Sequence, residues 1–171
     1  MLSSFRIRSF TSPRHFIGLA TTTPSSFSPD HDVNGTQIGE LFEKVKHELR
    51  AAGVADVDEL VGMSRPADTV IPPQLIWYFA GYESPSLSVD SLDELVVPAG
   101  DYFAVTYQGA ITGFDAAVNE IYGTIFPDSG LTPRDGLHLE VYPADWDRHD
   151  ENSCMDILIP IASGGILATQ S

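Results

Sequence analysis

The chain has few basic residues and one cysteine, and each of these shortages excludes a class of protein. Nine Lys and Arg stand against 24 Asp and Glu, so the formal net charge at pH 7 is −15. Because phosphate contacts need clustered positive charge, we expect no direct binding to nucleic acid. The single cysteine, Cys154, permits neither an internal disulfide nor a thiolate metal cage, and we expect a reducing, cytoplasmic setting.

Long apolar runs are also missing. No segment approaches the roughly 20 apolar residues that cross a membrane, so we expect no membrane contact. The 171 residues, 43% of them hydrophobic and 19% charged, are typical of one globular domain with its own core. Residues 1–29 carry Arg6, Arg8 and Arg14 without an acid, which imitates a transit peptide. However, the period-two alternation of SFRIRSF favours a strand there.

The order of the predicted elements repeats once along the chain. Strands are predicted at 4–10, 15–22, 74–83, 95–98, 101–109, 137–143 and 154–162, and helices at 36–52 and 112–127. We expect Thr36 to cap the first helix and a polar loop to join Gly53 to the Pro72–Pro73 pair. Each half then has a strand, a helix and two strands, which predicts a duplicated unit with both helices on one side of a joined sheet and a groove between the halves.

The segment Leu137–Asp147, LHLEVYPADWD, contains the residues on which the predicted chemistry depends. Alternation in a strand places Leu139 and Val141 on a core face, and His138, Glu140 and Tyr142 on the other. In a partly dry setting, a carboxylate attracts a cation by about 4 kcal/mol at an effective dielectric near 20. An apolar setting would also raise the pKa of Glu140, which makes it a candidate proton donor or acceptor.

Eight segments follow one another along nearly the whole chain: FRIRSF, IGLATTTP, IGELFEKVKHEL, YFAGYE, VPAGDYFAVTYQG, IYGTIFPDSGL, LEVYPAD and MDILIPI. In this order they resemble the GyrI-like family, the effector-binding domain of AraC- and MerR-type multidrug-sensing activators. The resemblance implies an α+β fold of two β-α-β-β modules of the SHS2 type. Their pseudo-twofold symmetry builds an antiparallel sheet with two main helices on one side and a ligand cleft between the halves.

The resemblance also implies a site. An acidic residue at the floor of an aromatic pocket meets cationic, lipophilic compounds in that family, and Glu140 matches it, while Tyr122 and Phe126 match helix aromatics of the same pocket. We therefore predict one effector-binding domain over 1–171, with halves at 5–98 and 99–162 and a tail at 163–171. No helix-turn-helix segment is found in the sequence, so we expect a standalone domain.

Three functions stay open. The first is a binding module for amphipathic, cationic or aromatic small molecules, with these candidate contacts: Trp77, Tyr78, Tyr107, Tyr122, Phe126, His138, Glu140, Tyr142 and Trp146. The second, implied by standalone family members, is hydrolysis of reactive cyclopropane-bearing compounds by Glu140 with Tyr107 or Tyr122. The third is an acidic modulator of DNA gyrase, like the family's namesake.

We expect no cofactor and no metal. Asp30, Asp32 and Asn34 match the opening of a calcium loop, but Leu41 stands where the bidentate Glu belongs. The oligomeric state and any protein partner are left open by the sequence.

Overall fold

The structure, a computed structural model, describes residues 1–168. Its strands are β1 (Leu2–Phe10), β2 (Arg14–Pro24), β3 (Glu59–Pro66), β4 (Leu75–Glu83), β5 (Asp93–Val97), β6 (Gly100–Gln108), β7 (His138–Pro143) and β8 (Cys154–Ile161). Its helical segments are α1 (Thr36–Ala51), the 3-10 turn Ile111–Gly113, α2 (Phe114–Glu120), the π-helical turn Ile121–Ile125 and α3 (Phe126–Asp128). Residues 169–171 of the predicted tail lie outside the described residues. In residues 1–168, no helix combines the length and the apolar character that a membrane span requires.

The strands form a single sheet in the order β1-β6-β8-β7-β3-β4-β2-β5, and neighbouring strands are antiparallel. The order β6-β8-β7 mirrors β2-β4-β3, so two three-stranded units meet where β7 pairs with β3. The outer strands cross over, because β1 pairs with β6 and β5 pairs with β2. The predicted α+β class with an antiparallel sheet is confirmed, while the division at residues 98 and 99 stays a prediction.

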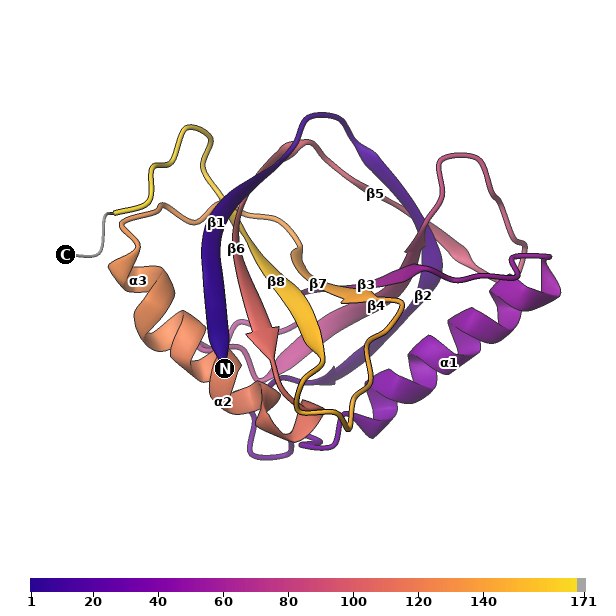
Figure 1. The fold of residues 1–171 in the computed structure, drawn as a ribbon, viewed down its shortest axis with the longest axis horizontal. Helices are drawn as coiled ribbons and strands as arrows, with labels where there is room; N and C mark the ends of the chain where they lie inside the picture. The colour runs from indigo at the N-terminus through magenta and orange to yellow at the C-terminus, as the bar shows by residue number, and fades with distance from the viewer. Residues whose placement is uncertain (169–171) are drawn as a thin grey trace.

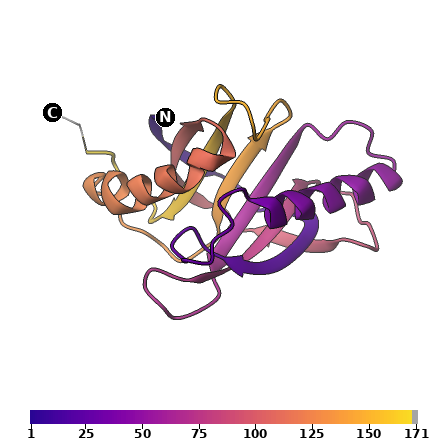
Figure 2. The same cartoon turned by 90° about the horizontal axis from the view of Figure 1, so that it is seen from below.

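The two faces of the sheet bury different cores. One face collects Phe10, Phe16, Met63, Phe79 and Leu139 in a cluster that no helix covers. The other face carries two clusters, one beneath α1 and one beneath α2 and α3. Both helical segments lie on this same side of the sheet, at its two ends (Figures 1 and 2). The central strands β7 and β3 therefore lie between the two helix-covered clusters.

Strand β3 lies inside the segment that the sequence predicted as a polar loop, so that prediction is wrong. Only Leu60, Val61 and Met63 supply its apolar side chains, and Gly62, Ser64 and Arg65 interrupt the alternation that identifies strands. The segment forms a strand because its backbone N–H and C=O groups pair with β4 on one side and with β7 on the other. The two strands that follow α1 are thus β3 and β4, and β5 lies at the outer edge of β2.

Helix α1 begins at Thr36, but the prediction that Thr36 caps it is wrong, because the capping group is the Asp32 carboxylate. Residue Gly35 adopts a left-handed conformation with φ of 58°, which glycine tolerates best. The chain turns there so that the Asp32 carboxylate accepts hydrogen bonds from the backbone N–H groups of Thr36 (2.6 Å) and Gln37 (3.3 Å). The second helical segment runs without a break from Ile111 to Asp128, close to the predicted 112–127.

Candidate functional site

Two tyrosine hydroxyls meet at Glu140 in the middle of the sheet. Glu140 is half-buried on β7 and points to the helix-covered face. Tyr78 from β4 and Tyr142 from β7 both donate hydrogen bonds of 2.7 Å to the same oxygen, Oε2. No residue in 1–168 donates a hydrogen bond to the other oxygen, Oε1. Oε1 of Glu140 can thus accept a hydrogen bond from a further partner.

Gly62 on β3 makes this arrangement possible. It lies opposite Glu140 in the register of β3 and β7, between Glu140 and the fully buried Tyr78. A Cβ atom at Gly62 would collide with the Tyr78 hydroxyl, and it would lie 2.6 Å from Cζ of that ring and 3.0 Å from Glu140 Oε2. Only a residue without a side chain lets Tyr78 cross β3 and reach the carboxylate.

The surroundings shift the proton equilibria of all three groups in the same direction. Burial raises the pKa of Glu140, and the hydrogen bonds from Tyr142 and Tyr78 oppose that rise. Burial and the nearby Glu140 charge raise the pKa of both Tyr78 and Tyr142 well above the ordinary tyrosine value. Both phenols therefore stay protonated donors over the whole physiological range, and Glu140 takes up a proton more readily than an exposed glutamate.

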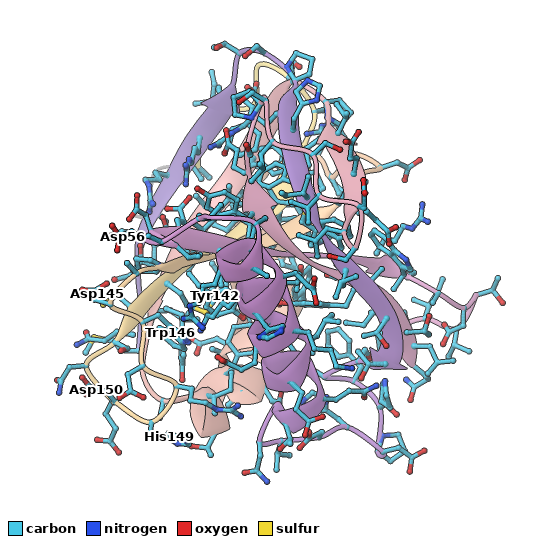
Figure 3. The ribbon with its side chains drawn as sticks, turned by 90° about the vertical axis from the view of Figure 1, so that its right-hand side faces the viewer. Asp56, Tyr142, Asp145, Trp146, His149 and Asp150 are labelled. Atoms are coloured by element: carbon cyan, nitrogen blue, oxygen red, sulfur yellow. The ribbon has the colours of Figure 1, made fainter. Side chains whose placement is uncertain are left out.

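A cavity of about 1110 Å³ opens above Glu140. Its walls come from α1, the start of α2, the loop before α1 and the β7–β8 loop. The aromatic and large aliphatic side chains of its lining are Ile38, Phe42, Leu60, Ile76, Tyr78, Ile111, Phe114, Tyr142 and Trp146. Figure 3 shows Tyr142 between the sheet and α1, with Trp146 and His149 on the loop beside that helix.

The rings around the carboxylate contact one another edge to face or at a tilt. Phe42 from α1 lies with its centroid 5.3 Å from that of Tyr142 and 6.2 Å from that of Tyr78. Trp146 lies 5.6 Å from Tyr142 on the other side. These distances fall in the range of favourable aromatic pairs, so the rings of the wall support one another.

Four of the predicted site residues line this cavity: Tyr78, Glu140, Tyr142 and Trp146. Trp77 lies on the opposite face of β4, because adjacent strand residues point to opposite sides of the sheet. There it stacks on Phe79 at 5.9 Å, with the Arg65 guanidinium 4.8 Å above its ring. Its contact with a ligand stays a prediction that this cavity does not support.

The other four predicted residues lie outside the cavity: Tyr107 and His138 are on strands β6 and β7, whereas Tyr122 and Phe126 are on the second helical segment. The Tyr122 hydroxyl is hydrogen-bonded to Nδ1 of His138, and burial lowers the pKa of that histidine to about 4. Tyr107 donates to the Ala110 carbonyl at 2.7 Å. Phe126 packs on Phe103 with ring centroids 5.7 Å apart. The hydroxyls that meet Glu140 are those of Tyr78 and Tyr142, rather than those of the predicted catalytic candidates Tyr107 and Tyr122.

Several cavity residues were not predicted as site residues. Phe42 of α1 and Phe114 of α2 are two of them. His31 Nε2 lies 2.8 Å from Asp115 Oδ1 and links the loop before α1 to α2 at the cavity. Arg148 of the β7–β8 loop lines the cavity as well. Since these contacts join segments far apart in the chain, no local pattern could have identified them.

No metal-binding arrangement is found in the described part of the chain, where no three His, Cys, Asp or Glu side chains gather as ligands. The site instead combines a carboxylate, two phenols and a large ring-lined cavity.

Known proteins share this architecture. The structure of SAV2435 bound to tetraphenylphosphonium superposes with a TM-score of 0.67 at 14% identity, covering 94% of this chain and 95% of that one. The C-terminal domain of EcmrR gives a TM-score of 0.65 at 12% identity, covering 93% and 97%. At these identities the likeness shows a shared fold.

Curated relatives are similar in sequence over most of this chain. The right origin-binding protein of Escherichia coli (strain K12) is 26% identical over 175 residues, which cover 91% of this chain. The transcriptional regulator Rob of Salmonella typhimurium (strain LT2) is 26% identical over 170 residues. The chain spans 58% of the length of each of these relatives.

A family model described as the GyrI-like small molecule binding domain matches residues 5–162, which include both helical segments and all of the strands that line the cavity. The chain therefore belongs to the GyrI-like family of small-molecule-binding domains.

Proposed function

We propose that this protein binds amphipathic small molecules with a positive charge or a flat aromatic system, and that Glu140 is their counter-ion. The observation that carries the proposal is the half-buried carboxylate at the floor of a ring-lined cavity, with one oxygen that receives no hydrogen bond from residues 1–168. A relative of the same fold, SAV2435, was solved bound to tetraphenylphosphonium, a lipophilic cation.

The energetics favour such a ligand. A cation in contact with Glu140 gains about 4 kcal/mol at an effective dielectric near 20. Each aromatic ring that faces the cation adds about 0.5 to 2 kcal/mol, and Phe42, Tyr142 and Trp146 are placed to do so. Flat aromatic walls accommodate ligands of many shapes, so we expect the protein to bind a broad range of ligands. The cavity exceeds the usual size of a drug site, which leaves room for bulky ions.

Titration with tetraphenylphosphonium tests the proposal. We expect Glu140→Gln to weaken binding by at least tenfold, because the amide keeps the shape of the carboxylate and removes its charge. Glu94→Gln is the matched control, since it makes the same change on the edge strand β5, away from the cavity. Wild-type affinity in the Glu140 variant would contradict the counter-ion role.

The proposed setting is the cytoplasm, where the exposed thiol of Cys154 stays reduced. We further propose that the domain makes no direct contact with nucleic acid, which the net charge of −15 supports. Modulation of DNA gyrase stays a prediction from the family resemblance.

Hydrolysis of electrophilic ligands is a second candidate, favoured by the raised pKa of Glu140 beside two phenols. In this reaction Glu140 takes a proton from the attacking water, while a tyrosine hydroxyl gives a proton to the ring atom whose bond breaks. With Tyr142 as that donor, the protonated Glu140 carboxyl then passes its proton to the Tyr142 phenolate along their shared hydrogen bond, so both groups return to their starting state. Chromatography of a strained cyclopropane substrate tests it: consumption by the wild type and not by Glu140→Gln supports an enzyme.

A further inference from the structure

We infer that the preferred ligands of this cavity are zwitterionic, with an anionic group that Arg148 recognises in addition to the cation at Glu140. The inference rests on the proposed function, which supplies the cationic half of the ligand. It concerns the positive charge of Arg148 in the cavity wall, which that function leaves without a role.

Arg148 lies in the wall of the cavity, on the loop between β7 and β8. Its Nη2 atom donates to the backbone carbonyl of Asn34, just before α1. Its Nε atom is buried and has no hydrogen-bond partner. Burial raises the pKa of Tyr142, and the charge of Arg148 opposes that rise, so the guanidinium acts on the same group that contacts Glu140.

The positive charge of Arg148 lacks a carboxylate partner within residues 1–168, although the chain is strongly acidic. Arg6 and Arg14, on the other side of the sheet, pair with Asp156 and Glu83. Two acids of the cavity lining, Asp115 and Asp32, have other partners. Asp115 contacts His31 at 2.8 Å, and the Asp32 carboxylate caps α1. A partly dehydrated guanidinium without a counter-ion is costly, and an anionic ligand group would remove that cost.

Helix α1 has a glycine at the point where Arg148 contacts it. Gly39 is the fourth residue of α1, and a Cβ atom there would collide with Nη1 of Arg148. Glycine weakens a helix interior relative to alanine, so its presence near the start of α1 needs a packing reason. The guanidinium provides that reason, because its flat edge lies against the bare helix backbone. Arg148 is therefore held in a fixed position, which is what recognition of a carboxylate requires.

The cavity thus presents opposite charges on its floor and on its wall. A simple cation gains the attraction of Glu140 and meets repulsion from Arg148, whereas a zwitterion satisfies both. An ordinary structural role, in which Arg148 only ties the β7–β8 loop to α1, would give no such distinction between ligands. The two roles therefore differ in a measurable way.

Rhodamine B and its ethyl ester test the inference, because they share one cationic ring system and differ only in a free carboxylate. We expect fluorescence titration to give about tenfold tighter binding of rhodamine B by the wild type, in the range of a charge-assisted hydrogen bond. Arg148→Gln should weaken rhodamine B about tenfold and leave the ester unchanged or more tightly bound. Arg50→Gln, at the exposed end of α1, is the matched control and should change neither.

The outcomes separate this inference from the proposed function. A parallel loss of both dyes in Arg148→Gln would identify a purely structural arginine and overturn the inference. So would a wild type that binds the ester as tightly as rhodamine B, while Glu140→Gln weakens both. If neither dye binds, or if both bind without regard to Glu140→Gln, the proposed function fails and the inference fails with it.

Discussion

Gly62→Ala should disconnect Tyr78 from Glu140 and destabilise the protein. The added methyl group would occupy the place of the Tyr78 hydroxyl and lie 2.6 Å from its Cζ, closer than real Cβ contacts allow. Because Tyr78 is fully buried at the centre of the sheet, its ring cannot move aside without displacing its neighbours in the cluster beneath α1.

The magnitude follows from two losses and one gain. Breaking a hydrogen bond to a charged group costs about 1.5 to 3 kcal/mol. Overpacking a filled core costs about 1 to 3 kcal/mol more. Replacing glycine by alanine restricts the unfolded chain and returns up to about 1 kcal/mol. The free energy of unfolding should therefore fall by roughly 1.5 to 6 kcal/mol.

Urea unfolding of purified variants measures this change. Gly123→Ala is the matched control, because no atom lies within 4 Å of a Cβ at that position in the second helical segment. It should leave stability unchanged or raise it by up to about 1 kcal/mol. Combining Gly62→Ala with Tyr78→Phe should cost less than the sum of the two single changes, since the phenylalanine lacks the colliding hydroxyl. A Gly62→Ala protein as stable as the wild type would refute the reasoning.

Three further changes probe the site and its support. Tyr142→Phe should raise the pKa of Glu140 further, because the carboxylate loses a donor; carbon NMR of the Glu140 carboxyl measures it, and a lower pKa would contradict the argument. His138 has a folded pKa of about 4 against an ordinary 6.5, so the free energy of unfolding should drop by up to about 3 kcal/mol as pH falls from 6.5 to 4. His138→Gln should abolish that part of the pH dependence in urea titrations, and an unchanged profile would count against it. Asp32→Ala should cost about 1 kcal/mol by removing the cap of α1, whereas Asp30→Ala should cost little in the same thermal unfolding assay.

For β7, the face of each side chain could be predicted from alternation alone. The sequence placed Leu139 and Val141 in the core and Glu140 on the opposite face. The rule is local and exact because successive strand residues point to opposite sides of the sheet. The fold class followed from the order of these elements and from the resemblance to a family with the same order.

The partners of Glu140 could not be predicted in this way. Tyr78 reaches it only because Gly62 leaves a gap on β3, and β3 itself was predicted as a loop. The walls of the cavity depend on how α1 and the β7–β8 loop approach each other. These segments are far apart in the sequence, so no local pattern predicts their contact. For the same reason Tyr107 and Tyr122 were candidates on the basis of residue type, although their hydroxyls bind Ala110 and His138.

Strand β1 lies at the edge of the sheet next to β6, which comes much later in the chain, and this has a consequence for folding during synthesis. By the time Val97 has left the ribosome, the chain contains α1, β2, β3, β4 and β5, and these strands can pair with one another. Strand β1 is synthesised before these strands, yet within residues 1–168 it pairs with β6 alone, which is not complete until Gln108. At a translation rate of about 5 to 20 residues per second, β1 waits on the order of 5 to 20 seconds with its backbone unpaired. Arg6 and Arg8 lie two residues apart on β1 and protect it during this interval, because charged side chains discourage an exposed strand from pairing with another nascent chain.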